Sequence, residues 1–286
     1  MKNKFLLIIT FALVFSCSSD NNDSTPEINT NPCIENSDSL YQGDVILETQ
    51  ADVDFFGALC YEGINGDLII GNSLNNDINS LLPSSCIKKV NNLSIEDTSL
   101  SCLEGINLTN QTFLNRLFIS ENENLITVGN INIPTNVGEL SIFQNNTLIN
   151  FSGFNNVEHI GNLVLQFNSG LINFVGLDSL TNCSALFVYE NTSLINFEGL
   201  ENLTNITGVN QIGLDVKFNP NLISFSGLDN LVYSDLLVIE NNISLNDYCG
   251  LNNLVLNGTI EFNNFSTNGC EYNPTLEDMH NGNCNQ

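Results

Sequence analysis

The chain has 286 residues, of which 42% are hydrophobic, and its 32 acidic and six basic side chains give a formal net charge of −26. This charge argues against binding to nucleic acid and against a basic face for anionic lipids, because both need clustered lysine and arginine. Two histidines and no tryptophan leave little material for metal-hydrolase or Ser-His-Asp chemistry. The sequence contains 51 asparagines, so the fold must accommodate many amides.

Residues 1–16 form a predicted targeting segment. Lys2 and Lys4 precede an apolar run that is too short to span a bilayer. The following VFSC resembles a bacterial lipoprotein signal, which implies lipid attachment at Cys17. The polar stretch at 17–42 predicts a flexible acidic tether, and its acidic residues resemble the export signal of Bacteroidetes surface lipoproteins. We therefore expect a surface-exposed lipoprotein of the cell outer membrane, which contacts the membrane only through its lipid; a secreted protein is the alternative.

A repeat of ~23 residues follows the tether and predicts the fold. Five copies obey L-x-[IVL]-x-x-N-x-x-L-x-x-[FY]-x-G-[LF], with starts at Leu140, Leu163, Leu186, Leu214 and Leu237. Looser copies start at Leu68, Leu93, Leu117 and Ile260. The alternation in L-x-I predicts a short strand, and stacked copies bury together an apolar face that one copy cannot bury alone. We predict a mainly β chain that forms a right-handed parallel β-solenoid of about nine turns.

The sixth position of the repeat is asparagine in six copies. These residues are Asn122, Asn145, Asn168, Asn191, Asn219 and Asn242. A buried asparagine side chain offers two donors and a carbonyl acceptor. Stacked copies can therefore satisfy backbone groups at successive bends, which would otherwise be buried without partners. The pattern predicts a structural asparagine ladder.

Both ends of a stacked core need lids. Thr49 is a plausible N-cap for a short helix at 51–56, whose Val53 and Phe56 can cover the first turn. After Phe262 the sequence loses its period, so the remaining residues should close the other end. We therefore assign one solenoid domain to 43–286. It consists of an N-terminal cap at about 43–66, repeats at about 67–262 and a C-terminal cap at about 263–286.

The repeats resemble two related solenoids, the leucine-rich repeat and the receptor L domain. The stretch VILETQADVDFFG before GINGDLIIG, at 45–71, is similar to receptor L domains of Bacteroidetes surface proteins. The C-terminal run at 249–284, with CGL, YNPT and GNC, is similar to the same group. This resemblance covers about 43–284 and implies a disulfide between Cys249 and Cys284. It says almost nothing about a ligand.

The nine cysteines indicate disulfides in an exported protein. Cys60 and Cys86 lie eight and seven residues before their strand starts, so adjacent turns bring them within disulfide range. Cys183 occupies an aliphatic position of the repeat and is predicted to be a buried free thiol. Cys249, Cys270 and Cys284 lie in the predicted C-terminal cap, where we expect one pair, and Cys33 and Cys102 have no clear partner. Without a C-x-x-C pair or a nearby histidine, the cysteines do not predict a zinc site.

No motif indicates catalysis or a cofactor. Neither His159, expected to be exposed on a return segment, nor His280 has a serine or cysteine with a carboxylate in motif spacing. A polysaccharide lyase would need basic groups, and the repeats offer only Arg116 and Lys217. Scattered acidic pairs leave weak calcium binding open, although a solvated acidic face explains them better.

The outer face of the predicted sheet is the remaining candidate for a functional site. The second and fourth positions of each strand point outward, so Phe118, Phe143, Phe187 and Tyr189 fall on one face across four turns. Exposed aromatic side chains indicate contact with protein or sugar, although packing between parallel strands is the alternative. The sequence therefore predicts a non-enzymatic binding or adhesion protein whose partner is a protein or a neutral glycan. A polysaccharide-acting enzyme and a ligand-free spacer are the alternatives.

Overall fold

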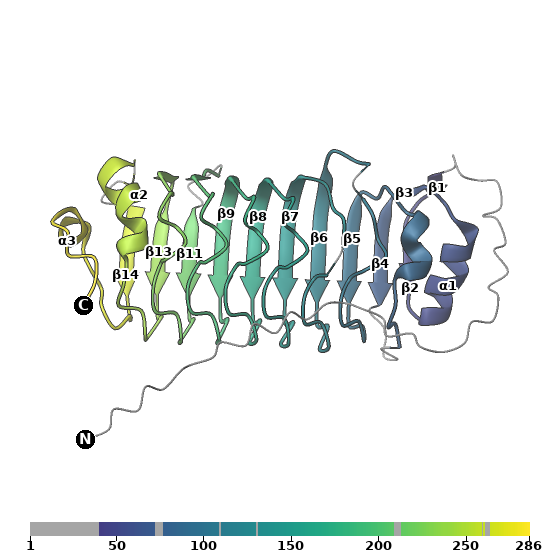
Figure 1. Cartoon of the computed structure of the whole chain (residues 1–286), viewed down its shortest axis with the longest axis horizontal. Helices are drawn as coiled ribbons and strands as arrows, with labels where there is room; N and C mark the ends of the chain where they lie inside the picture. The colour runs from purple at the N-terminus through teal and green to yellow at the C-terminus, as the bar shows by residue number, and fades with distance from the viewer. Residues whose placement is uncertain are drawn as a thin grey trace, which may run out of the picture.

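The computed structural model describes residues 40–71, 77–108, 110–129, 131–208, 213–258, 260 and 264–286. Within these ranges the chain is mainly β and forms a parallel β-solenoid of about 8 turns with ~23-residue repeats, as predicted. Its strands lie side by side and point in one direction, and helices stand at both ends (Figure 1). Cys17, Cys33 and the rest of the segment before residue 40 lie outside the described residues.

One large parallel sheet provides the long axis of the molecule. Its strands, in spatial order, are β2 (Val45–Leu47), β4 (Asp67–Gly71), β5 (Asn92–Glu96), β6 (Leu114–Ser120), β7 (Asn136–Phe143), β8 (His159–Gln166), β9 (Asn182–Tyr189), β11 (Leu214–Lys217), β13 (Leu237–Glu240) and β14 (Phe265–Asn268). Two short strands also belong to this sheet: β10 (Asn205–Ile206) pairs with β9, and β12 (Tyr233–Ser234) pairs with β10. A separate two-stranded sheet consists of β1 (Leu40–Gln42) and β3 (Gly63–Asn65). Because β1 pairs with β3, the folded part begins by residue 40, inside the stretch predicted to be tether.

The register of the sheet agrees with the repeat until its last turn. Leu68 pairs with Leu93 and Leu214 pairs with Leu237, as equivalent positions should. The predicted start at Ile260 is wrong, because Leu237 pairs with Phe265 instead. Helix α2 (Asn252–Asn257) lies between these strands and advances only about 1.5 Å per residue, which delays the last strand. The last strand is therefore present but begins later than predicted.

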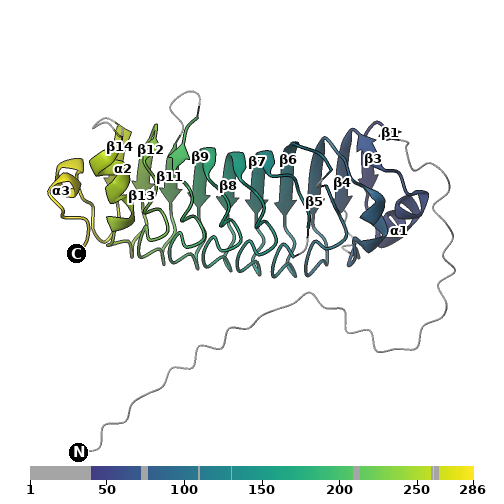
Figure 2. The same cartoon turned by 45° about the horizontal axis from the view of Figure 1, so that its top comes forward.

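The core is a column of apolar side chains between the sheet and the return segments, which stack along the same axis (Figure 2). The aromatic position of the repeat points inward and forms a continuous stack. Its successive ring centroids lie 5.9 Å apart from Phe151 to Phe174, 5.2 Å to Phe197, 5.1 Å to Phe225 and 5.4 Å to Tyr248. These rings are fully buried, so each turn packs mainly on its two neighbours.

The asparagine ladder runs through the bends that follow the strands, and all six of its residues are fully buried. Asn168 illustrates the geometry. Its Oδ1 accepts from the Asn145 backbone N–H at 3.0 Å, and its Nδ2 donates to Ile142 O at 2.9 Å and Gln166 O at 3.1 Å. Its own backbone N–H donates to Asn191 Oδ1 at 3.1 Å. Asn168 therefore joins three consecutive turns.

The N-terminal lid is helix α1 (Gln50–Leu59), which begins at the predicted N-cap. Thr49 and Asp52 form a reciprocal capping box, and Val53 and Phe56 are buried against the first turns. The 3-10 helix η1 (Leu82–Cys86) packs beside α1. The predicted disulfide between Cys60 and Cys86 joins the ends of these two helices.

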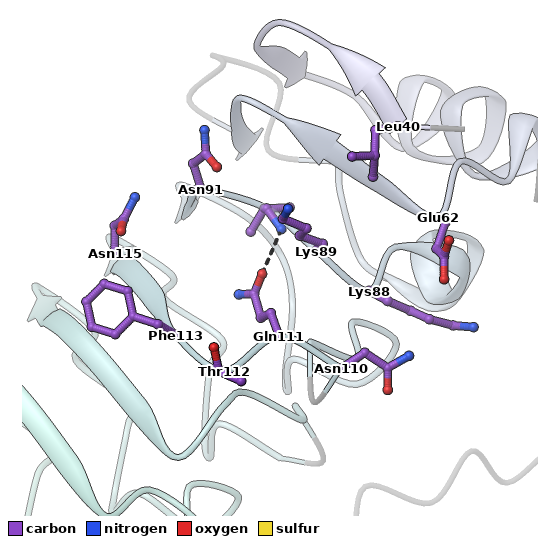
Figure 3. A pocket seen from close by; sticks show the side chains of 11 residues that line it. Leu40, Glu62, Lys88, Lys89, Asn91, Asn110, Gln111, Thr112, Phe113 and Asn115 are labelled. Carbon is purple, nitrogen blue, oxygen red and sulfur yellow. Dashed lines mark hydrogen bonds between the residues drawn. The ribbon is translucent and has the colours of Figure 1, made fainter. Parts of the chain in front are cut away.

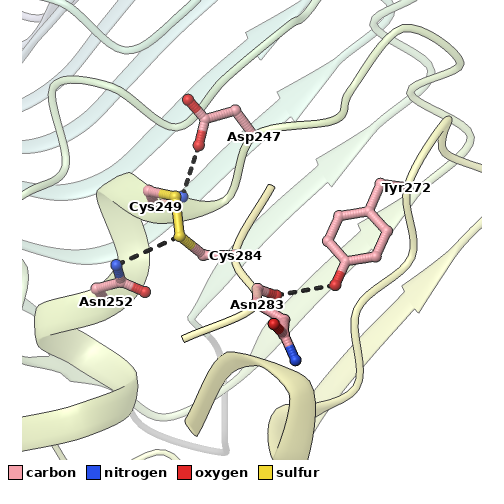
Figure 4. The surroundings of a disulfide bond; sticks show 6 residues. All are labelled: Asp247, Cys249, Asn252, Tyr272, Asn283 and Cys284. Carbon is pink, nitrogen blue, oxygen red and sulfur yellow. Dashed lines mark hydrogen bonds between the residues drawn. A yellow bond between two sulfur atoms is a disulfide. The ribbon is translucent and has the colours of Figure 1, made fainter. Parts of the chain in front are cut away.

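The C-terminal lid contains η2 (Cys249–Leu251), α2 and α3 (Leu276–His280). The Cys249–Cys284 disulfide, which the family resemblance implied, fixes the end of the chain to the last turn (Figure 4). Beside it the Cys249 backbone N–H donates to Asp247 Oδ1 at 2.9 Å, and the Tyr272 hydroxyl donates to Asn283 O at 2.8 Å. The end of the solenoid is thus held by covalent and polar contacts.

The remaining described cysteines differ in state. Cys183 is a buried free thiol, as predicted, and burial raises its pKa to about 12. Cys270 is free and half-buried. Cys102, for which the sequence suggested no partner, is disulfide-bonded.

Candidate binding surface

The outward side chains of the sheet form two rows that run along the solenoid. Register places Ser94, Phe118, Ser141, Val164, Phe187, Asp215 and Val238 in the first row. It places Glu96, Ser120, Phe143, Gln166, Tyr189, Lys217 and Glu240 in the second row. The four aromatic residues singled out in the sequence all lie in these rows and are half-buried.

These four rings occupy three separate places. Phe118 lies under the Arg116 guanidinium, whose carbon is 4.7 Å from the ring centroid. Phe187 and Tyr189 lie on the same strand, with ring centroids 6.0 Å apart. Within the described ranges no ring contact joins Phe118, Phe143 and the Phe187–Tyr189 pair. The predicted ligand face is therefore not one continuous aromatic patch.

Tyr189 is engaged in a polar network of the sheet itself. Its hydroxyl donates to Asp215 Oδ2 at 2.6 Å, and Lys217 Nζ lies 3.2 Å from the same carboxylate and 3.5 Å from Glu240. Burial, followed by the hydrogen bond and charge of Asp215, raises the pKa of Tyr189 well above its usual value. The hydroxyl thus stays protonated, and these contacts give Tyr189 a structural role.

A third row, which the sequence analysis missed, follows directly after the strands. Its residues have positive φ between 49° and 60°, and they are Asp97, Glu121, Gln144, Phe167, Glu190, Phe218 and Asn241. This left-handed conformation costs a non-glycine residue roughly 1–2 kcal/mol, and asparagine and aspartate tolerate it best. Phe167 and Phe218 are bulky residues at such positions. The sequence signal that could have identified this row is its place in the repeat, directly before the ladder asparagine.

Three phenylalanines gather at these bends and line a groove of about 730 Å³, which we call the aromatic groove. Phe143 of the second row meets Phe167 edge to face at 5.5 Å between centroids. Phe218 lies further along the same groove and is 51% exposed. The other lining residues are Gln144, Asn146, Ser169, Glu190, Thr192, Pro220 and Asn241.

The chemistry of the aromatic groove is apolar and mostly neutral. The rings offer flat apolar contact area with few rotatable bonds. The amides and hydroxyls around them can both donate and accept hydrogen bonds. Glu190 is the charged residue among the described groups that line the groove. The arrangement can therefore hold a ligand with apolar faces and hydroxyl or amide groups, and its described lining residues offer no positive charge to a phosphate or a sulfate.

The two histidines lie apart from this groove. His159 is exposed at the first position of β8 rather than on a return segment, and its Nδ1 lies 3.4 Å from Asn182 Nδ2. His280 ends α3, with Nδ1 2.8 Å from Leu276 O. Over the described ranges, no three His, Cys, Asp or Glu residues gather as metal ligands. Within the same ranges no helix is long and apolar enough to cross a bilayer.

No family model, curated protein or solved structure matches this chain. The resemblance noted in the sequence therefore has no counterpart in these comparisons. The architecture itself is clear from the register and the repeat. The chain is a parallel β-solenoid with an aromatic groove beyond the carboxyl ends of its strands.

Proposed function

We propose that the protein is a non-enzymatic recognition protein of the cell surface, which binds a protein or a neutral glycan at the aromatic groove. The observation that carries the proposal is the pair Phe167 and Phe218, held at positive φ beside an open groove. Folding alone favours asparagine or glycine there. Strain that the fold does not need is typical of functional sites.

The composition of the groove supports this choice of ligand. Hydroxyl-rich glycans and protein loops both combine apolar faces with groups that donate and accept hydrogen bonds. Aromatic anchors in such a setting usually provide a large share of the binding free energy. The formal charge of −26 disfavours polyanions, which leaves neutral or cationic partners.

The cell-surface location in this proposal is argued from the sequence. The lipoprotein signal before Cys17 and the acidic residues that follow it suggest an anchor on the outer membrane with the solenoid outside the cell. The resemblance of 43–284 to receptor L domains of surface proteins points the same way. In this proposal the tether presents the groove to partners in the surroundings.

An array of glycans and proteins, probed with the mature chain, tests the proposal. Phe167→Asn combined with Phe218→Asn removes both rings but suits positive φ, so folding should be unharmed. We expect this variant to bind at least about 30-fold more weakly, which corresponds to roughly 2 kcal/mol for two anchor residues.

Phe187→Ser combined with Tyr189→Ser provides the comparison on the flat sheet. If this variant loses binding and the groove variant keeps it, the ligand lies on the strands instead. If wild type binds no probe, the proposal fails and a spacer becomes the better interpretation. If both variants bind a probe like wild type, recognition at this groove is refuted and the ligand lies elsewhere on the solenoid.

A further inference from the structure

A second concave site lies at the opposite edge of the sheet, where β5 and β6 begin (Figure 3). This pocket, which we call the N-terminal pocket, has a volume of about 460 Å³. Its walls are the segments 88–91 and 110–113, which lead into the two strands, and Leu40 of β1 and Glu62 complete it. It shares no lining residue with the aromatic groove.

The N-terminal pocket contains an unusual concentration of positive charge for this chain. Of the six basic residues in the sequence, two lie in 1–16 and two more, Arg116 and Lys217, form ion pairs with carboxylates. The last two, Lys88 and Lys89, are adjacent, exposed and part of the pocket wall. Neither forms an ion pair within the part of the chain that the structure describes. With Glu62 also in the wall, the lining side chains carry a net charge of +1 (two lysines and one glutamate), which favours one negative group in an otherwise acidic protein.

Gln111 contributes a hydrogen-bond donor that has no partner. Its Oε1 accepts from the Val90 backbone N–H at 3.2 Å, the dashed bond in Figure 3, so the amide is fixed between the two wall segments. Its Nε2 is buried and makes no hydrogen bond to any described residue. A buried donor without a partner costs free energy. An oxygen atom of a bound ligand would remove that cost.

A second hollow of about 510 Å³ adjoins the pocket, and Thr112 and Phe113 line both. Its floor includes Gly138 and Gly161, where a Cβ would come within 2.5 Å and 2.1 Å of backbone oxygens. Phe113 is 50% exposed between the two hollows. The polar groups along the second hollow include Asn136, His159 and Asn182. We call the two adjoining hollows, which are largely neutral and carry the lysines at one end, the channel.

We propose that this channel binds an oligosaccharide whose terminal sugar carries a carboxylate. The carboxylate lies beside Lys89 and accepts from Gln111 Nε2, while Lys88 adds positive charge at the edge of the pocket next to Glu62. Neutral sugar units then extend across Phe113 into the second hollow, where amides and the imidazole match hydroxyls that donate and accept. An extended peptide would need free main-chain partners, and the parallel ladder already uses the backbone of these strands. The proposal concerns a different edge of the sheet and does not rest on the aromatic groove.

Titration of the purified full chain with a glucuronic-acid-terminated trisaccharide, observed by NMR, tests the proposal. The matching neutral trisaccharide, in which glucose replaces the terminal acid, is the reference probe. We expect at least about tenfold tighter binding of the acidic probe, and a loss of that preference as salt increases. Equal affinity for the two probes, or no binding of the acidic one, overturns the proposal.

Three variants locate the site. Lys88→Gln combined with Lys89→Gln should abolish the tenfold preference, whereas Lys217→Gln, which removes a positive charge elsewhere, should keep it. Gln111→Glu preserves an acceptor for Val90 N–H but replaces the donor with an oxygen, so it should abolish binding of the acidic probe. Unchanged binding in these pocket variants overturns the assignment.

Two further outcomes separate the alternatives. A peptide with a free C-terminal carboxylate should bind more weakly than the acidic trisaccharide, and the reverse order overturns the ligand class. The aromatic-groove variant, with Phe167→Asn and Phe218→Asn, should bind the acidic probe like wild type. A parallel loss in that variant would show that the probe occupies the aromatic groove instead.

Discussion

Replacing Asn168 by leucine tests whether the asparagine ladder stabilises the solenoid. The change removes the acceptor of the Asn145 N–H and a donor to each of Ile142 O and Gln166 O. Gln166 O keeps a hydrogen bond from the Gln144 N–H, so this carbonyl loses only one of its two donors. With about 1–3 kcal/mol for each buried group left unpaired, and the lower end for carbonyls, we expect a loss of about 3 kcal/mol.

Chemical denaturation followed by circular dichroism measures this loss as a shift of the unfolding midpoint. Asn162→Leu is the matched control, because Asn162 lies half-buried on the outer face of β8, the strand that precedes Asn168. We expect the control to change the free energy of unfolding by less than about 0.5 kcal/mol. Equal midpoints for the two variants would refute the ladder as a source of stability.

Three further predictions concern cysteines. Cys17→Ser should release the protein from membranes, and continued membrane partitioning without fatty-acid labelling of wild type would contradict the lipoprotein signal. Opening the C-terminal disulfide by Cys249→Ser and Cys284→Ser should cost about 4 kcal/mol for a sequence separation of 35 residues, seen as a lower melting temperature; an unchanged value would show that the lid holds without it. Burial raises the pKa of Cys183 from 9.0 to about 12. The protonated thiol therefore contributes fully to the free energy of unfolding below pH 9, and this contribution declines as the pH rises towards 12. Cys183→Val should lack this part of the decline when its stability is measured over the same pH range.

The repeat made the interior predictable. Each turn packs mainly on its two neighbours, so a position that reads as inward in one copy is inward in the next. Phe174 and Asn168 follow this rule, and both are fully buried where the pattern placed them. The Cys60–Cys86 disulfide could be predicted in the same way, because its two cysteines occupy similar places on adjacent turns.

The binding features were harder to predict because they depend on departures from the repeat. Phe167 is exposed to the groove by a bend whose geometry the ladder imposes, and side-chain alternation alone does not reveal that bend. Gln111 and Lys89 come from return segments that differ from the other copies, so no period relates them. The misplaced start at Ile260 has the same origin, since α2 interrupts the spacing there.

The stacking of turns also determines how the molecule responds to a pulling force. The hydrogen bonds between strands lie along the long axis, so tension along that axis loads the contacts between neighbouring turns one after another. A detached turn of ~23 residues replaces ~4.8 Å of stack by roughly 75 Å of extended chain. The disulfides at both lids limit this extension at the ends, where unravelling would otherwise begin. A solenoid anchored at one end and loaded at the other would therefore lengthen in steps before it releases its load.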